Sequence, residues 1–322
     1  MSKTRANPGG GIRILGMGKC LPARCVTNED LTEYVDTSDA WIRERTGIRT
    51  RYYSTTETHL DLAATAAQRA LERTGIRPDQ IGLCIVATIS ADYATPSAAC
   101  LVQERLGLPG DIPAFDLNAA CTGFLYALNT ASALLATPSV HRPYALVIGA
   151  EQLTRMLNME DRSTCILFGD GAAAAVVEAD DSARFVCRLG SQGDVHALNT
   201  PGLMRREPYI HMDGRAVFRF ATMAMERSIR LIETESGVCA KDMDYIICHQ
   251  ANERILAHVQ KRMGLTRQQV YRNLDRYGNT SGASIPLALA DLDEEGLLHA
   301  GSRLILSGFG SGLTWAGAYM EF

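Results

Sequence analysis

The sequence predicts an α/β protein built from two copies of one plan, and two repeated patterns support this. An amphipathic helix that ends at a glycine is followed by a short apolar strand, once in each half of the chain. Further along, QERLGL from Gln103 is echoed by QKRMGL from Gln260, and ALVIGAE near Leu146 is echoed at almost the same spacing by RLILSGFG near Leu304. Self-similarity at such a long period indicates a duplication in which strands alternate with helices.

The repeated helix and strand can be placed by their periodicity. Residues 59–75 put small and apolar side chains at helical spacing and stop at a glycine, which tolerates the left-handed conformation of a helix end. The run at 81–90 is short and β-branched enough for a buried strand. Residues 217–237 repeat the helix, and residues 244–248 repeat the strand. We expect both pairs to belong to one buried α/β architecture.

The duplication also predicts how the chain is divided. We expect an N-terminal half at residues 1–180 that carries a nucleophilic cysteine, and a C-terminal half at residues 181–322 that carries a histidine and an asparagine. The boundary falls in the polar stretch EADDSARF. Because ligands of open α/β sheets bind at the strand ends, we expect the functional groups where equivalent strand ends meet near a pseudo-twofold axis.

Composition excludes several classes of function. The 322 residues carry a net charge of −4, which gives no general affinity for nucleic acid or anionic membranes. No window is apolar enough to span a bilayer, and the polar, glycine-rich start lacks the apolar region of a signal peptide. The nine cysteines are scattered without a C-x-x-C pair, so we expect free thiols, no bound metal and a cytoplasmic protein.

One cysteine stands out by its position. Residues 112–136 are typical of a strand, a turn of small residues and a helix that is apolar on nearly every face. Cys121 falls at the start of that helix, where unpaired N–H groups and the helix dipole favour a thiolate. From position alone, Cys121 is either a nucleophile or a packed core thiol.

The second half supplies two further polar candidates. The turn NTSGAS occupies the place that AACTG has in the first half, so the repeat sets Asn279 opposite Cys121. His249 directly follows an apolar strand and should project into the same region. A lone histidine is usually structural, but a Cys/His/Asn set can perform acyl transfer. The C-terminal loop LSGFGSGLTW can add backbone N–H groups to an oxyanion hole, or it is simply a tight glycine turn.

Long motifs carry a resemblance to a known family. The chain resembles β-ketoacyl-acyl-carrier-protein synthase III over essentially its whole length, in DTSDAWIRERTGIRTRYY, DLNAACTGFLYAL, FGDGAAAAVV, ICHQANERI, GNTSGASIPLAL and GFGSGLTW. The resemblance implies a duplicated five-layer αβαβα thiolase-like fold and a homodimer. It also implies an acyltransferase of fatty-acid biosynthesis that uses coenzyme A thioesters as substrates and needs no cofactor.

The resemblance assigns roles to matching positions. Cys121 would accept the acyl group, while His249 and Asn279 would hold the thioester carbonyl of malonyl-acyl-carrier protein as it loses carbon dioxide. Backbone N–H groups of Cys121 and Ser311 would form the oxyanion hole, with serine standing where the family often has glycine. Trp41, Arg45 and Arg162 match family residues that bind the adenine end of coenzyme A. Adenine is a planar ring on which tryptophan and guanidinium groups can stack.

Two surfaces would select the substrates. A carrier protein would dock on basic side chains that otherwise form a solvated helix face: Arg219, Arg254, Lys261 and Arg262. Thr95 stands where some family members place a phenylalanine that closes the acyl pocket from across the dimer. We therefore expect acetyl-CoA or another short primer, with longer or branched acyl groups as an open alternative.

Other functions were weighed against this one. A degradative thiolase needs a second cysteine in the C-terminal glycine loop, and SGFGSG has none. A papain-like hydrolase has no use for the duplication, and a non-catalytic scaffold subunit would have lost its cysteine. A relative in specialised metabolism that condenses a different acyl group, or makes an ester, remains an alternative.

Overall fold

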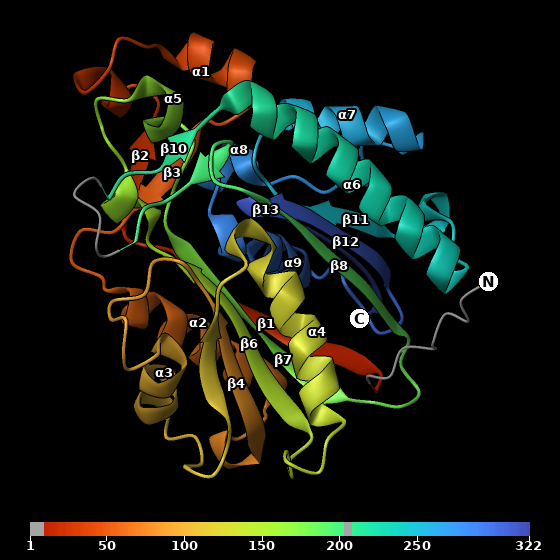
Figure 1. Cartoon of the computed structure of the whole chain (residues 1–322). Helices are drawn as coiled ribbons and strands as arrows, with labels where there is room; N and C mark the ends of the chain where they lie inside the picture. The colour runs from red at the N-terminus through yellow and green to blue at the C-terminus, as the bar shows by residue number, and fades with distance from the viewer. Residues whose placement is uncertain (1–9, 203–207) are drawn as a thin grey trace.

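A computed structural model of the chain describes residues 10–202 and 208–322 and contains two main β-sheets (Figure 1). The expectation that the start of the chain is no signal peptide concerns residues 1–9, which lie outside the described residues. The first sheet has the order β1-β7-β6-β4-β5, with bounds Ile12–Cys20, Gly171–Ala179, Tyr144–Glu151, Ile81–Ala87 and Ala114–Leu117. The second has the order β11-β12-β13-β8, with bounds Tyr245–Cys248, Arg303–Gly310, Gly312–Glu321 and Phe185–Asp194.

The two sheets share one pattern of strand directions. In the first, β6 is parallel to β4 and antiparallel to β7, which is antiparallel to β1. In the second, β12 is parallel to β11 and antiparallel to β13, which is antiparallel to β8. The first sheet adds β5 beyond β4. The predicted boundary after residue 180 falls in the loop between β7 and β8.

Helices cover the sheets in layers. Two helices, α4 and α9, lie between the sheets, α2 and α3 cover the outer face of the first sheet, and α6 and α7 cover the outer face of the second (Figure 1). Their bounds are Gly123–Leu135, Ser284–Glu294, His59–Thr74, Ala98–Leu106, Gly214–Ser236 and Glu253–Met263. Three large apolar clusters fill the spaces between these layers. The five layers confirm the predicted αβαβα arrangement.

The outer helices begin and end as their sequences predict. Thr58 caps α2 by accepting from the Asp61 N–H, and the Asp61 carboxylate accepts from the Thr58 N–H in return. The helix ends at Gly75, with φ +69°, and α6 ends in the same way at Gly237, with φ +70°. Both repeated helices are therefore confirmed.

Short elements complete the fold around the upper part of Figure 1. Two small ribbons pair Arg24–Thr27 (β2) with Thr50–Tyr53 (β3) and Leu198–Asn199 (β9) with His211–Met212 (β10). The short helices are Asp39–Thr46 (α1), Arg162–Cys165 (α5) and Leu274–Tyr277 (α8). Among the described residues, no helix combines the length and apolarity needed to cross a membrane.

A glycine in the first sheet lets the central layer approach closely. A Cβ on Gly149 of β6 would lie 2.5 Å from the carbonyl oxygen of Gly282, in the 3₁₀ turn Ser281–Ala283 (η6) that leads into α9. The same Cβ would lie 3.1 Å from the Ala283 Cα. Because backbone atoms cannot swing aside as a flexible side chain can, this contact requires glycine.

We expect Gly149→Ala to lower the free energy of unfolding by about 1–3 kcal/mol, because the added methyl overpacks the contact with η6. Denaturant titration of both proteins measures the change. Gly110→Ala is the matched control, since a Cβ there meets nothing within 4 Å. Equal midpoints for the two variants would contradict the packing argument.

Candidate active site

The nucleophile candidate lies in a strained turn at the centre of the molecule. Cys121 belongs to the 3₁₀ turn Ala120–Thr122 (η3), which runs directly into α4. The preceding Ala120 has φ +47°, a conformation that side chains other than glycine rarely adopt. Asn118 holds this turn, because its Oδ1 accepts a hydrogen bond from the Ala120 N–H at 3.3 Å.

The second half repeats this turn in detail. Ser281 has φ +48°, and its N–H donates to Asn279 Oδ1 at 2.9 Å. The repeat therefore aligns Asn279 with Asn118, and it aligns Gly282 with Cys121. The prediction that Asn279 stands opposite Cys121 was wrong in register, because the asparagine supports the turn in both halves and precedes the residue at its centre.

His249 reaches the same region from the end of β11. Its Nδ1 lies 2.8 Å from Ser284 Oγ, in the first turn of α9, and the same oxygen accepts from the Gln250 N–H at 2.9 Å. The imidazole packs edge-on against Phe309, with 5.2 Å between ring centroids. Its Nε2 is buried and has no hydrogen-bond partner among the described residues.

These contacts select one form of the imidazole. Since Gln250 donates to Ser284 Oγ, the hydroxyl hydrogen of Ser284 is available for His249 Nδ1, which leaves the ring proton on Nε2. Burial lowers the pKa of His249 to about 3, so the ring is neutral at physiological pH. Neutral His249 thus offers an unused N–H donor.

Burial lowers the pKa of His249 but raises the pKa of Cys121. The Cys121 side chain is removed from water, and this raises the pKa of its thiol to about 12. Burial of the thiol thus opposes the thiolate that the helix terminus is expected to favour. Nearby Glu151 raises the pKa further, whereas Ser281 lowers it.

Sequence reasoning missed the acid beside this cysteine. Glu151 ends β6 and is fully buried. Its carboxylate accepts from Ser90 Oγ at 2.6 Å and from the N–H groups of Ile89 at 3.2 Å and Gly282 at 3.4 Å. Burial raises its pKa to about 7. The available signal was a single acidic residue at the end of the apolar run ALVIGAE.

The C-terminal glycine loop lies against the nucleophile turn. A Cβ on Gly310 would lie 2.8 Å from the Cys121 nitrogen, so only glycine permits this approach. Ser311 follows, and its hydroxyl donates to the Leu198 carbonyl at 2.6 Å. Among described residues, positive φ outside glycine occurs at Ala120 and Ser281, so serine at 311 adopts an ordinary backbone.

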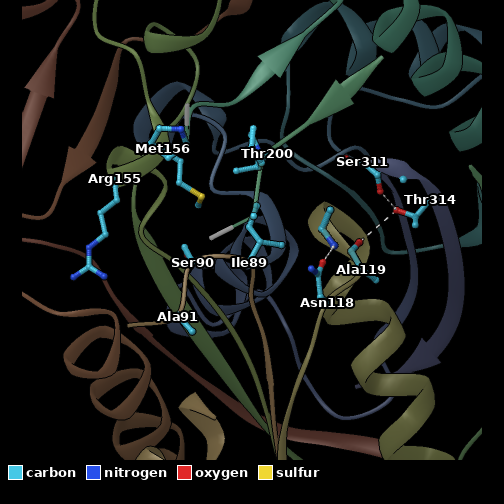
Figure 2. A pocket seen from close by; sticks show the side chains of 15 residues that line it. Ile89, Ser90, Ala91, Asn118, Ala119, Arg155, Met156, Thr200, Ser311 and Thr314 are labelled. Carbon is cyan, nitrogen blue, oxygen red and sulfur yellow. Dashed lines mark hydrogen bonds between the residues drawn. The ribbon is translucent and has the colours of Figure 1, made fainter. Parts of the chain in front are cut away.

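A cavity of about 710 Å³ opens beside this turn (Figure 2). Figure 2 shows Asn118, Ala119 and Ser311 on one side and Ser90 and Met156 on the other. Its remaining lining residues are Ile89, Ala91, Ala120, Arg155, Thr200, Pro201, Gly202, Pro208, Gly312 and Thr314. The predicted pocket residue Thr95 is exposed on the loop after β4 and does not line this cavity within one chain.

The structure brings the three expected coenzyme A residues together. The guanidinium carbons of Arg45 and Arg162 each lie 4.7 Å from the centre of the Trp41 ring. Arg162 is steadied by donating to the Asp36 carbonyl at 2.7 Å. All three come from short elements, α1 and α5, at one edge of the molecule (Figure 1).

The expected docking residues fall into two groups. Arg219 and Arg254 line a hollow of about 730 Å³ that also includes Arg45. Lys261 and Arg262 lie in the last turn of α7, where the Arg262 Nε approaches a carboxylate oxygen of Glu226 at 3.0 Å. Arg219 and Arg254 therefore share a hollow with Arg45, which contacts Trp41. The charge of Arg262 is partly neutralised by Glu226.

Comparison with known proteins decides the family. Two family models match, 3-oxoacyl-[acyl-carrier-protein] synthase III at residues 115–193 and its C-terminal counterpart at residues 234–322. The β-ketoacyl-[acyl-carrier-protein] synthase III of Clostridium acetobutylicum is 44% identical over 97% of this chain and 98% of its own length. The chain belongs to the β-ketoacyl-acyl-carrier-protein synthase III family.

Solved structures of this family superpose over nearly the whole chain. The 3-oxoacyl-[acyl-carrier-protein] synthase III of Aquifex aeolicus is 39% identical with a TM-score of 0.92, over 97% of this chain and 100% of its own. The priming β-ketosynthase of the R1128 polyketide pathway is 32% identical with a TM-score of 0.91, over 100% and 99%. The synthase III family thus confirms the thiolase-like fold, whereas the residue roles stay predictions.

We expect Ser284→Ala to slow malonyl decarboxylation about tenfold, which corresponds to the loss of one hydrogen bond. In this variant His249 Nδ1 no longer accepts from Ser284, so the ring proton is no longer held on Nε2. Acylation of Cys121 should change less. The nitrogen chemical shifts of His249, measured by NMR, report the tautomer directly. Ser284→Thr keeps the hydroxyl and serves as control, and an unchanged tautomer in the alanine variant would disprove the assignment.

Proposed function

We propose that the chain condenses a short acyl-CoA with malonyl-acyl-carrier protein and so initiates fatty-acid synthesis. The acyl group moves first to Cys121. The carbanion left when the malonyl group loses carbon dioxide then attacks that acyl group and yields a 3-oxoacyl-carrier protein. The observation that carries this proposal is the position of η6 among the three candidate residues. Asn279 precedes η6, and Ser284, which follows it, contacts His249 Nδ1. The backbone of η6 packs against η3, the turn that contains Cys121.

Two neutral donors support the decarboxylation step. The Oδ1 atom of Asn279 is taken by the Ser281 N–H, which turns the amide nitrogen toward other acceptors. His249 offers its Nε2 proton in the same buried region. Two donors aimed at one thioester oxygen would stabilise the enolate as carbon dioxide leaves. Phe309 against the imidazole helps to keep water out.

The close approach of Gly310 to the Cys121 nitrogen supports an oxyanion hole. The two N–H groups that would form it, those of Cys121 and Ser311, come from turns that touch each other. Such preorganised donors stabilise the tetrahedral intermediate of acyl transfer without rearranging.

A homodimer would complete the acyl pocket. Strand β5 pairs with β4 on one side, and no strand of the described residues pairs with its other edge, so a second chain can extend the sheet there. Thr95 is exposed near this edge and would face the partner's cavity. Its small side chain supports acetyl or another short primer and leaves room for longer or branched ones. The similar polyketide priming ketosynthase makes specialised metabolism the second candidate.

Substrate surfaces and compartment follow from the same proposal. The Trp41 cluster would bind the adenine of coenzyme A, which is a substrate, and no separate cofactor takes part.

An acidic carrier protein would dock over the hollow lined by Arg219 and Arg254. All nine cysteines are free, which supports a reducing, cytoplasmic compartment.

We expect acetyl-CoA to add a single acetyl group to Cys121 and malonyl-acyl-carrier protein to remove it as a 3-oxoacyl product. Intact-mass spectrometry follows both steps, and Cys121→Ala should show neither. A panel of longer and branched acyl-CoA substrates defines the primer. Labelling only by such primers would favour the specialised-metabolism candidate, and labelling without condensation would refute the synthase proposal.

Docking can be tested with two exposed arginines. We expect Arg219→Ala to raise the KM for malonyl-acyl-carrier protein up to about fivefold, because no acidic side chain of the described residues neutralises it. Arg262→Ala is the matched control and should have a smaller effect, since Arg262 already pairs with Glu226. Steady-state kinetics at two salt concentrations measures both, and equal effects would argue against docking at the hollow.

A further inference from the structure

The proposed reaction leaves the most deeply buried acid of the site without a role. Glu151 is completely buried, and none of the ion pairs in the described part of the chain involves it. Its hydrogen-bond donors in the described structure are the neutral groups of Thr88, Ser90, Ile89 and Gly282. A carboxylate that is buried without a cation is costly, so this group has a strong tendency to take up a proton.

A hydroxyl connects this acid to the nucleophile. The Ser281 Oγ is buried and makes no hydrogen bond of ordinary geometry in the described structure. It lies in η6 next to Gly282, whose N–H reaches Glu151 at 3.4 Å and whose Cβ would lie 3.4 Å from the Ala120 carbonyl oxygen, beside Cys121. The same hydroxyl lowers the pKa of Cys121 and the pKa of Glu151. The positive φ of Ser281, maintained by Asn279, fixes the position of this hydroxyl. Ser281 thus belongs to the turn that contacts both the carboxylate and the nucleophile turn.

Acylation requires a group that accepts the thiol proton. His249 is poorly suited, because Ser284 occupies its Nδ1 and, in the tautomer inferred above, its Nε2 carries the ring hydrogen. Among the described residues, Glu151 is the acid whose charge acts on the Cys121 thiol. Because the proton leaves as the sulfur–carbon bond forms, the thiol need not ionise beforehand.

The other titratable groups around Glu151 come from the neighbouring elements. On the side of α2, His59 Nε2 lies 2.9 Å from Thr88 Oγ1, which stands between it and Glu151. Burial lowers the pKa of His59, so it stays neutral. Beyond it, Arg155 and Asp92 neutralise each other at 2.7 Å. Cys121 on η3 is a further titratable neighbour in the described part of the chain, and η6 presents Ser281 and a backbone N–H.

We propose that Glu151 accepts the proton of Cys121 through the Ser281 hydroxyl during acylation and returns it during condensation. This rests on the proposed function. In acylation the S–H bond breaks, the sulfur bonds to the acyl carbon, and coenzyme A leaves as a thiolate that takes a proton from water. Ser281 passes one proton to Glu151 and receives the one from Cys121. In condensation the acyl carbon bonds to the carbanion, the electron pair of the broken S–C bond stays on sulfur, and the stored proton returns there.

The decisive variant is Glu151→Gln, which keeps the size of the side chain and one acceptor oxygen for Ser90 and Ile89 but cannot take up a proton; it gives up only the acceptor of the long Gly282 bond. We expect its acylation by acetyl-CoA to be about 100-fold slower, on the scale of a lost general base. The wild-type rate should rise with pH through the carboxyl pKa of about 7 and level off above it, and the glutamine variant should lack this rise. Glu151→Asp should restore part of the rate and its pH dependence.

Rapid-quench mass spectrometry gives the acylation rates. Decarboxylation of malonyl-acyl-carrier protein without primer is the control, because it moves no proton from Cys121 and should survive in Glu151→Gln. Infrared difference spectra of the acetylated enzyme should show the carbonyl stretch of a protonated carboxylic acid, which the glutamine variant lacks.

Each result decides the matter. Acylation of Glu151→Gln at the wild-type rate with the wild-type pH profile would overturn the proposal. So would an equal loss of acylation and decarboxylation, which would mean that Glu151 only maintains the turns. Failure of wild-type protein to be acylated by any acyl-CoA would instead refute the proposed function.

Discussion

The contact between the η3 and η6 turns is the constraint on which the rest of the site depends. Each turn holds one non-glycine residue at positive φ, Ala120 in the first and Ser281 in the second, and each is held by an asparagine two residues earlier. Such backbone persists only when its surroundings over-determine it. The sheets on both sides and the helices that follow the turns supply those surroundings. The fold therefore holds two strained turns in contact; Cys121 lies on one of them, and His249 and Glu151 reach the contact from the ends of β11 and β6.

Burial away from water is the main cause of the shifted pKa values of Cys121, Glu151 and His249. Burial disfavours whichever form of a group is charged, so the pKa values of Cys121 and Glu151 rise while that of His249 falls. At neutral pH Cys121 and His249 are therefore uncharged, and Glu151, with a pKa of about 7, is the member of the three whose charge changes in this range. In such low-dielectric surroundings, hydrogen bonds to a developing negative charge are stronger than they are in water. In the proposed reaction, the histidine donates a hydrogen bond, and the thiol and the carboxyl group exchange the proton.

The sequence predicted those features that depend on local pattern. Helix ends at Gly75 and Gly237, and the buried strands, followed from periodicity and from glycine's tolerance of positive φ. The clustering around Trp41 followed from family motifs and was confirmed by position. The role of Ser284 and the burial of Glu151 could not be predicted, because they depend on contacts between elements far apart in the chain. The burial that raises the pKa of the Cys121 thiol could not be predicted for the same reason, because helix position is local and hydration is not.

The duplicated turn has been used differently in the two halves. At the centre of η3 stands the sulfur of Cys121, whereas the equivalent position in η6 is Gly282. A Cβ there would lie only 3.3 Å from Glu151 Oε1 and 3.4 Å from the Ala120 carbonyl oxygen. The missing side chain lets the carboxylate accept from the Gly282 N–H and brings the acid to the edge of the nucleophile turn. One copy of the turn thus carries the cysteine, and the other carries a glycine, which lets the Glu151 carboxylate approach.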